Sequence, residues 1–288
     1  YCETAMPDTA LKQQALRLAQ QAKIAARQLA PLSSEEKNRA LLLMAEKLGA
    51  RSDFLIAANQ KDLEFAKAKG VASAMLDRIA LNPTRVQEMA QGLRAVAALP
   101  DPVREVVKMW RRPNGLQVGR MRIPLGVIGI IYEARPNVTA DAAALCLKSG
   151  NAVILRGGSE AHHSNQAIGA VLREACAETR VPPDAVQVVQ LKDHALVNEL
   201  LQLEDYIDLI IPRGGEELIR AVVANSKIPV IKHYKGICHV YVDSDASLAM
   251  AERICFNAKV QRPSVCNALE TLLVHQAVAA QFLPAMIE

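Results

Sequence analysis

The chain has 288 residues, of which 51% are hydrophobic and 22% charged, and its formal net charge at pH 7 is +4. This composition is ordinary for a soluble globular protein with one large core or two smaller ones. Lys and Arg are scattered without a run of five, which argues against nucleic acid as the main partner, and the apolar stretches are too short and interrupted to cross a membrane.

Residues 9–100 are predicted to be helical. Apolar residues recur at helical spacing from Ala10 to Leu29, and Ser33-Ser34-Glu35-Glu36 predicts the capped start of a second helix that runs to about Ala50. A third helix is expected from Ser52-Asp53. Asn82-Pro83-Thr84 predicts a fourth start, because proline is tolerated in the first helical turn.

A β-hairpin is predicted at about 105–123. Two segments of alternating character flank Pro113-Asn114-Gly115, and Asn-Gly is the strongest short hairpin signal. On the pattern alone this is an ordinary hairpin that packs on its own domain.

From Gly126 to Val242, apolar strands alternate with amphipathic helices. The predicted strands are 126–132, 151–156, 186–190, 208–211, 229–231 and 238–242. The predicted helices are about 136–149, 160–178, 194–203, 214–225 and 245–258. This order is typical of an α/β protein with a Rossmann-like, doubly wound parallel sheet. A second α/β domain is expected to start near Lys259, so the predicted division is 1–258 and 259–288.

Two strand-to-helix turns have similar sequences, Arg156-Gly157-Gly158 and Arg213-Gly214-Gly215. Ligands bind at this edge of an open parallel sheet, where glycines let backbone N–H groups approach a phosphate and an arginine can pair with it. The alternative is that the Gly-Gly pair only forms the turn and the following glutamate complements the helix dipole. No G-x-G-x-x-G pattern occurs in the chain.

Cys266 lies just before an apolar run, 269–274, that predicts a strand. A thiol on a loop beside a rigid strand can act as a nucleophile, whereas most single cysteines are small buried hydrophobes. The other cysteines, Cys2, Cys146, Cys176, Cys238 and Cys255, form no C-x-x-C pair. With no histidine cluster at metal-ligand spacing, the pattern predicts a reducing cytoplasm and neither disulfides nor a metal.

The segment 261–274, QRPSVCNALETLLV, is similar to the active-site segment of the gamma-glutamyl phosphate reductases, a branch of the aldehyde dehydrogenase superfamily. The segments 123–139, 151–158 and 206–215 resemble the same family in the same order. The resemblance implies the second step of proline biosynthesis. In that reaction NADPH reduces L-glutamyl 5-phosphate to L-glutamate 5-semialdehyde, and phosphate is released. It also implies a chain that continues beyond Glu288 and a homo-oligomer formed through the hairpin arm.

The resemblance assigns residue roles as well. Cys266 would be the nucleophile, Asn137 an oxyanion donor and Arg135 an anion binder for the acyl phosphate. An N-cap is the alternative role for Asn137. The predicted cofactor-binding residues are Arg156, Gly157, Gly158, Arg213, Gly214 and Gly215.

Arg156 favours NADPH over NADH, because a basic residue can bind the 2′-phosphate and no acidic residue immediately ends that strand. The alternative is a solvated arginine. Ile231 stands where hydrolytic aldehyde dehydrogenases carry a catalytic glutamate, which argues against hydrolysis. A nucleotide-binding module without catalysis remains a further alternative.

Overall fold

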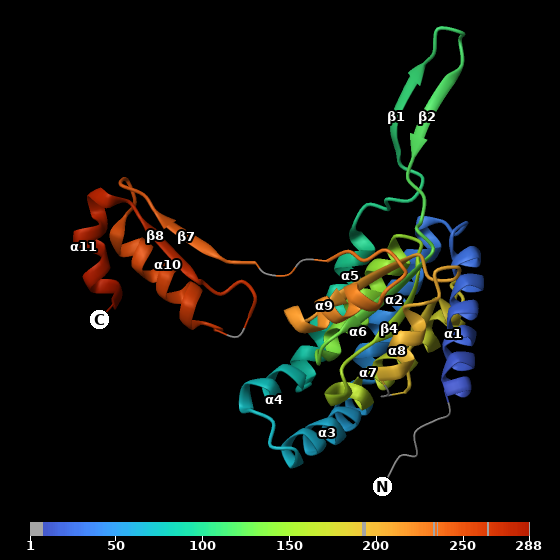
Figure 1. Cartoon of the computed structure of the whole chain (residues 1–288), viewed down its shortest axis with the longest axis horizontal. Coiled ribbons are helices and arrows are strands. Elements are labelled where there is room, and N and C mark those ends of the chain that lie inside the picture. Colours follow the sequence, from blue (N-terminus) through green and yellow to red (C-terminus); the bar gives the residue numbers. More distant parts are fainter. Residues whose placement is uncertain (1–7, 192–193, 233, 235, 264, 288) are drawn as a thin grey trace. The chain divides into compact units, whose positions relative to one another are not determined.

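The computed structural model describes residues 8–191, 194–232, 234, 236–263 and 265–287. The chain divides after Lys232 into two compact units, 1–232 and 233–288. Figure 1 traces the chain through its helices and strands.

Among the described residues, the first unit begins with five helices, four of which start where the sequence predicts. They are α1 (Asp8–Leu29), α2 (Ser34–Ala50), α3 (Ser52–Ala68), a short α4 (Ser73–Ile79) and α5 (Pro83–Ala98). Of these, α4 was not predicted as a separate helix. The capping box of α2 is confirmed: Ser33 Oγ accepts the Glu36 N–H at 3.2 Å, and the Glu36 carboxylate accepts the Ser33 N–H at 2.7 Å. Asn82 caps α5 through the Arg85 N–H at 2.8 Å. Local capping chemistry therefore fixes where α2 and α5 start.

A four-stranded parallel sheet follows. Its strands are β3 (Val127–Tyr132), β4 (Ala152–Arg156), β5 (Val186–Val188) and β6 (Leu209–Arg213). Their order is β5-β4-β3-β6, so the winding direction reverses at β3, as in a doubly wound fold. Ile131 pairs with Arg156 and Tyr132 with Arg213, which brings the ends of β4 and β6 to the end of β3. The predicted Rossmann-like sheet is confirmed.

Helices cover both faces of this sheet. Helices α6 (Pro136–Lys148) and α7 (His162–Ala177) pack together against it and are backed by α2, α3 and α5. Helices α1 and α8 (His194–Leu200) pack together and α1 also contacts the sheet, while α9 (Glu216–Asn225) packs on β6. Because both faces are covered, every residue of β3 and β4 is buried.

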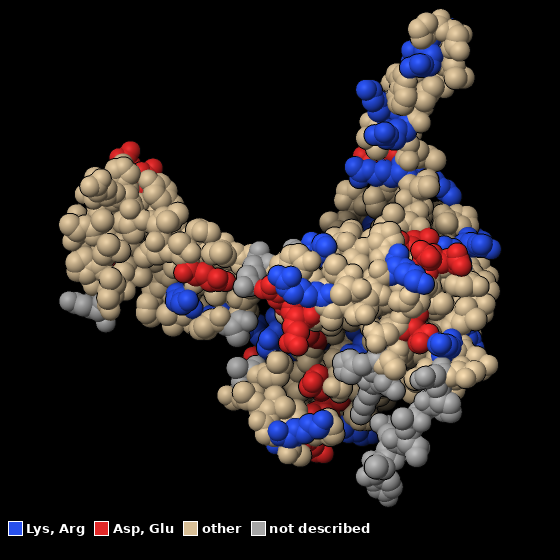
Figure 2. Space-filling view, viewed as in Figure 1, with Lys and Arg blue, Asp and Glu red and all other residues tan. Residues whose placement is uncertain are grey.

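The hairpin arm consists of β1 (Val106–Arg111) and β2 (Gln117–Met121). The Arg112 N–H donates to the Leu116 carbonyl at 2.8 Å and the Gly115 N–H to the Arg112 carbonyl at 2.9 Å. Gly115 has a φ of 88°. The connection is thus a three-residue loop with glycine in the left-handed position, not a two-residue Asn-Gly turn. All six side chains of β1 are exposed, and Figure 2 shows basic side chains along the arm.

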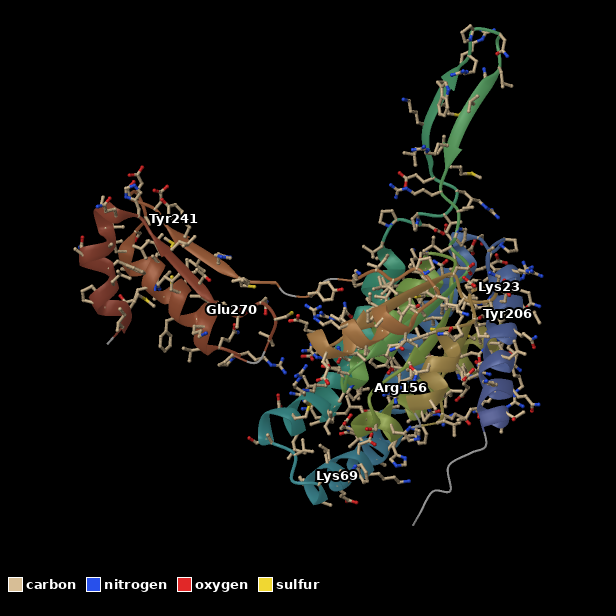
Figure 3. The ribbon with its side chains drawn as sticks, in the orientation of Figure 1. Lys23, Lys69, Arg156, Tyr206, Tyr241 and Glu270 are labelled. Atoms are coloured by element: carbon tan, nitrogen blue, oxygen red, sulfur yellow. The ribbon has the colours of Figure 1, made fainter. Side chains whose placement is uncertain are left out.

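The second unit pairs β7 (His239–Val242) with β8 (Thr271–Val274) in parallel. Helices α10 (Leu248–Val260) and α11 (Gln276–Ile287) pack together, and the buried core consists of Val242, Cys255, Leu269 and Phe282. Figure 3 labels Tyr241 on β7 and Glu270 just before β8.

Two strand predictions differ from the structure. The segment 229–231 forms only a single bridge, between Val230 and Ile210. The segment 238–242 belongs to the sheet of the second unit and not to the Rossmann-like sheet. The predicted domain boundary near Lys259 falls within α10. The chain divides earlier, after Lys232, because β7 pairs with the later strand β8. Among the described residues, no helix combines the length and hydrophobicity needed to span a membrane.

Candidate active site

Three loops meet at the carboxyl end of β3, between β3 and β6, where the winding of the sheet reverses. The Glu133 N–H donates to the Arg213 carbonyl at 3.1 Å, and the Gly215 N–H donates to Glu133 Oε1 at 2.7 Å. A Cβ on Gly158 would lie 3.0 Å from the Ala134 nitrogen. The structure thus brings the two predicted cofactor loops to one edge, which is where ligands bind in open α/β sheets.

The glycines of these loops are explained by close packing. A Cβ on Gly157 would lie 2.9 Å from Tyr132 Cε2, and one on Gly214 would lie 2.6 Å from Glu133 Cδ. Neither glycine has a positive φ. Close packing against neighbouring protein atoms is therefore enough to require glycine at these positions, in line with the alternative that the Gly-Gly pair only forms the turn.

Protein carboxylates already bind amides at the starts of α7 and α9. Asp62 on α3 accepts the N–H groups of His163 at 3.0 Å and Ser164 at 2.8 Å, and also the Ser164 hydroxyl at 2.6 Å. Glu133 takes the Gly215 amide before α9. Asp62 is buried, so the α7 amides that it binds are closed to a phosphate. A dinucleotide at this edge would rely on the arginines and the remaining loop amides.

Arg156 is only 8% exposed, which excludes the alternative of a solvated arginine. Figure 3 labels it in the first unit. Burial lowers the pKa of Arg156, and the nearby carboxylate of Glu160 opposes that shift. The sequence expectation of an arginine without an acidic neighbour therefore needs correction, because the turn after β4 brings Glu160 close. A buried guanidinium at this edge suits a phosphate group, so the residues present fit a dinucleotide.

Arg213 is exposed, and its carbonyl accepts the Glu133 amide, so its backbone is fixed at the edge. Arg135 is half-buried and occupies the N-cap position of α6. Asn137 is therefore the second residue of α6, and the alternative of an N-cap is excluded. Asn137 is exposed, and its Nδ2 donates to Asp141 Oδ2 at 3.2 Å.

Buried hydrogen bonds link the end of β3, the start of α6 and the start of α7. The Tyr132 hydroxyl and Thr139 Oγ1 are 2.7 Å apart, and Thr139 Oγ1 donates to Asn165 Oδ1 at 3.0 Å. Burial raises the pKa of Tyr132, so its hydroxyl stays protonated. These hydrogen bonds between Tyr132, Thr139 and Asn165 were not predicted from the sequence.

Cys266 is exposed on a turn between α10 and β8, as predicted. Its carbonyl accepts the Cys238 Sγ at 3.3 Å, and the Leu269 N–H anchors the end of the turn on the Ala258 carbonyl at 2.9 Å. Among the cysteines that the structure describes, Cys238 is half-buried, and Cys146, Cys176 and Cys255 are buried. Cys2 lies outside the described residues.

Cys266 belongs to the second unit, and Asn137 and both cofactor loops belong to the first. Ile231 is exposed, and its amide donates to the Ile210 carbonyl at 3.0 Å. Its aliphatic side chain has no acid or base function. Within the described ranges, no group of three or more His, Cys, Asp or Glu side chains is placed to hold a metal ion.

Known proteins resemble this chain over nearly its whole length. It is 60% identical to the gamma-glutamyl phosphate reductase of Geobacter metallireducens over 274 residues, which are 95% of this chain and 66% of that protein. It is 54% identical to the enzyme of the same name from Thermodesulfovibrio yellowstonii, over 96% of this chain and 66% of that protein. The chain thus spans slightly less than two thirds of the length of these curated relatives.

A solved structure with the same enzyme name shares this fold. The crystal structure of gamma-glutamyl phosphate reductase from Thermotoga maritima matches with a TM-score of 0.87 at 44% identity, over 95% of this chain and 66% of that one. The aldehyde dehydrogenase family model matches residues 3–288, and so covers the Rossmann-like sheet, its glycine loops and the Cys266 turn in one continuous stretch. Sequence and fold agree, and the chain belongs to the aldehyde dehydrogenase family.

Proposed function

We propose that this chain carries the cofactor-binding and nucleophile-bearing parts of a reductase that converts L-glutamyl 5-phosphate to L-glutamate 5-semialdehyde in proline biosynthesis. The observation that carries the proposal is the exposed thiol of Cys266, on a turn before β8, in a chain 54–60% identical to gamma-glutamyl phosphate reductases. The free cysteines among the described residues suit a cytoplasmic enzyme.

In the proposed mechanism, the Cys266 thiolate attacks the acyl carbon, and the bond from that carbon to the phosphate oxygen breaks. Phosphate leaves and a thioester remains on Cys266. The dinucleotide, when bound, supplies the hydride that reduces the thioester. Asn137 donates a hydrogen bond to the resulting oxyanion, and Arg135 binds the phosphate group. The carbon–sulfur bond then breaks, and aldehyde and thiolate are released.

Arg156, Gly157, Gly158, Arg213, Gly214 and Gly215 would hold the dinucleotide at the β3–β6 edge. The buried guanidinium of Arg156 supports NADPH as the preferred form, because it can pair with a 2′-phosphate. Because Asp62 binds the amides at the start of α7, arginine side chains would neutralise more of the phosphate charge than the N-terminus of α7 would.

The experiment is an assay of the natural gene product that contains these residues, run in reverse with glutamate 5-semialdehyde, NADP and inorganic phosphate. NADPH formation should require phosphate, since phosphate must attack the thioester to release the product. An equal rate without phosphate would indicate a hydrolytic aldehyde dehydrogenase and contradict the proposal.

The hairpin arm is proposed to hold subunits together in a homo-oligomer. Its strands expose Val106, Val107, Met109 and Trp110, an apolar surface that its own unit does not cover. Removal of 106–121 should lower the mass measured by light scattering while the helix content by circular dichroism stays nearly constant. An unchanged mass would contradict this role.

A further inference from the structure

Asp141 on α6 is a half-buried carboxylate with little support. Within the described part of the chain, its side chain forms one hydrogen bond, with Asn137 Nδ2 at 3.2 Å, and no ion pair. Burial raises the pKa of Asp141, and only the bond from Asn137 opposes that shift. A desolvated carboxylate with one neutral partner costs folding free energy, since water would satisfy it better.

The packing around Asp141 shows what the side chain contacts. Helix α5 packs on α6 at this point, and Gly92 of α5 lies against the carboxylate: a Cβ there would be 3.4 Å from Asp141 Oδ1. The oxygen on the other side, Oδ2, accepts the Asn137 amide one helical turn earlier. The carboxylate is thus held against α5 and faces the one residue of α6 that the mechanism assigns to the oxyanion.

An asparagine side chain has two N–H groups in one plane. When Asp141 accepts one of them, it fixes the rotation of that plane, and the second N–H remains for a ligand. When the carboxylate acceptor is ionised, the bond is also stronger than a bond between neutral groups. An oxyanion donor needs this preorganisation, since a freely rotating exposed amide would have to be ordered during the reaction.

We propose that Asp141 is a positioning residue that orients the Asn137 amide for the oxyanion, and that it does so at a cost in stability. This inference rests on the proposed function, because it assigns Asp141 a role in the same reaction. It predicts opposite signs for activity and stability when the charge is removed, which a purely structural residue would not give.

The test is a double-mutant cycle in the natural gene product that contains these residues, with Asp141→Ala, Asn137→Ala and the double variant. Asp141→Ala should lower kcat about tenfold and leave KM within about twofold, because it disturbs a transition-state contact and not substrate binding. In the Asn137→Ala background the same substitution should change kcat by less than about twofold. Equal losses in the two backgrounds would overturn the inference.

Two further variants separate positioning from structure. Asp141→Asn keeps an acceptor oxygen and removes the charge, so it should retain more activity than Asp141→Ala and unfold at the same or a higher urea concentration than the wild type. A lower unfolding midpoint would overturn the stated cost. Glu64→Ala is the matched control, because Glu64 accepts an amide N–H from Gln60 at 3.0 Å with the same four-residue spacing on the exposed face of α3. It should leave kcat unchanged, and a similar loss there would overturn the assignment.

The proposed function and this inference fail differently. If the wild type shows no phosphate-dependent reaction, the proposed function fails, and the cycle is then measured by urea unfolding of the same four proteins. Additive unfolding free energies for Asp141→Ala and Asn137→Ala would show that the two side chains do not interact, which overturns the inference as well. If the wild type is active but Asp141→Ala has its full kcat, the inference alone fails.

Discussion

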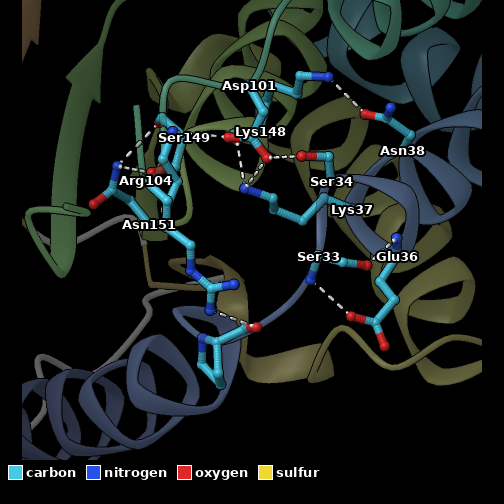
Figure 4. A network of polar contacts seen from close by, with 12 residues as sticks. Ser33, Ser34, Glu36, Lys37, Asn38, Asp101, Arg104, Lys148, Ser149 and Asn151 are labelled. Carbon is cyan, nitrogen blue, oxygen red and sulfur yellow. Dashed lines mark hydrogen bonds and ion pairs between the residues drawn. The ribbon is translucent and has the colours of Figure 1, made fainter. Parts of the chain in front are cut away.

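Lys37 on α2 and Asp101, at the base of the hairpin arm, form a buried ion pair with 2.6 Å between Nζ and Oδ2 (Figure 4). Their side chains are only 1% and 10% exposed. Lys37 Nζ also donates to the Lys148 carbonyl at 3.2 Å, and Lys148 Nζ donates to Asn38 Oδ1 at 2.6 Å. The network therefore connects α2, the end of α6 and the segment that leads into the arm.

Lys37→Met should destabilise the first unit by about 3–5 kcal/mol, because it leaves the Asp101 carboxylate buried without its cation. Urea unfolding followed by circular dichroism measures the loss. Arg122→Met is the matched control, since Arg122 and Glu105 pair at 3.1 Å with both side chains more than half exposed. That change should cost at most about 1 kcal/mol. Equal effects of the two substitutions would contradict the burial argument.

The same carboxylate gives a pH dependence. Burial alone would raise the pKa of Asp101, but hydrogen bonds from Lys37, Ser34 and the Val103 amide outweigh it, so the pKa lies below the ordinary value of 3.8. Such a group stabilises the fold above its unfolded pKa, and the contribution is lost as pH falls through the lower folded value. The wild type should therefore lose stability below about pH 4 more steeply than Asp101→Asn, in urea unfolding at a series of pH values. Parallel curves would show that Asp101 titrates normally.

Thiol labelling tests the choice of nucleophile. Burial raises the pKa of both Cys146 and Cys176 to about 12, so these thiols are protonated at pH 8 as well as covered. Iodoacetamide should modify Cys266 first, as read by peptide mass spectrometry, and Cys266→Ser should abolish reduction while NADPH binding survives. Cys255→Ser is the control and should keep activity if it folds. Substantial turnover by Cys266→Ser would remove this residue from the mechanism.

Arg156→Ala should raise the dissociation constant of NADPH about ten- to a hundredfold and that of NADH much less, because one charge-assisted hydrogen bond is worth about 1.5–3 kcal/mol. Fluorescence titration with both dinucleotides measures the difference. Arg112→Ala, on the exposed loop of the arm, is the control and should change neither constant. An identical shift for NADPH and NADH would place Arg156 away from the 2′-phosphate.

Gly157→Ala should destabilise the first unit by about 1–3 kcal/mol and weaken dinucleotide binding. A Cβ at 157 would collide with Asn165 Nδ2 and would lie 2.9 Å from the Tyr132 ring. It would therefore push apart the hydrogen-bonded side chains of Tyr132, Thr139 and Asn165. At Gly236 a Cβ would have no atom within 4 Å, and Gly236→Ala serves as the control with a change near zero. Equal unfolding midpoints for the two variants would contradict the packing explanation of Gly157.

Sequence patterns predicted the features that depend on neighbours along the chain. The capped starts at Ser33 and Asn82, the strands β3 and β4, and the turn that carries Cys266 all follow from local chemistry. The pairing of β7 with β8 could not be predicted, because the sequence pattern of a strand does not indicate which other strand it pairs with. Nor could the contacts of Asp62 with α7, which join residues 101 and 102 positions apart. Asp141 was within reach of sequence reasoning, since its four-residue spacing from Asn137 places both on one helix face.

The junction of β3 with β6 also affects the order of folding. Val127 on β3 donates its amide to Asp208 Oδ2 across 81 residues, at 2.8 Å, and Lys23 on α1 binds the same carboxylate at 2.8 Å across 185 residues. Contacts that close such long loops form late, because the entropy of loop closure must be overcome first. The pairing of β6 with β3, on which the edge for the dinucleotide depends, is therefore expected after β3 and β4 have paired. During refolding, amide hydrogens of β6 should gain protection from exchange later than those of β4.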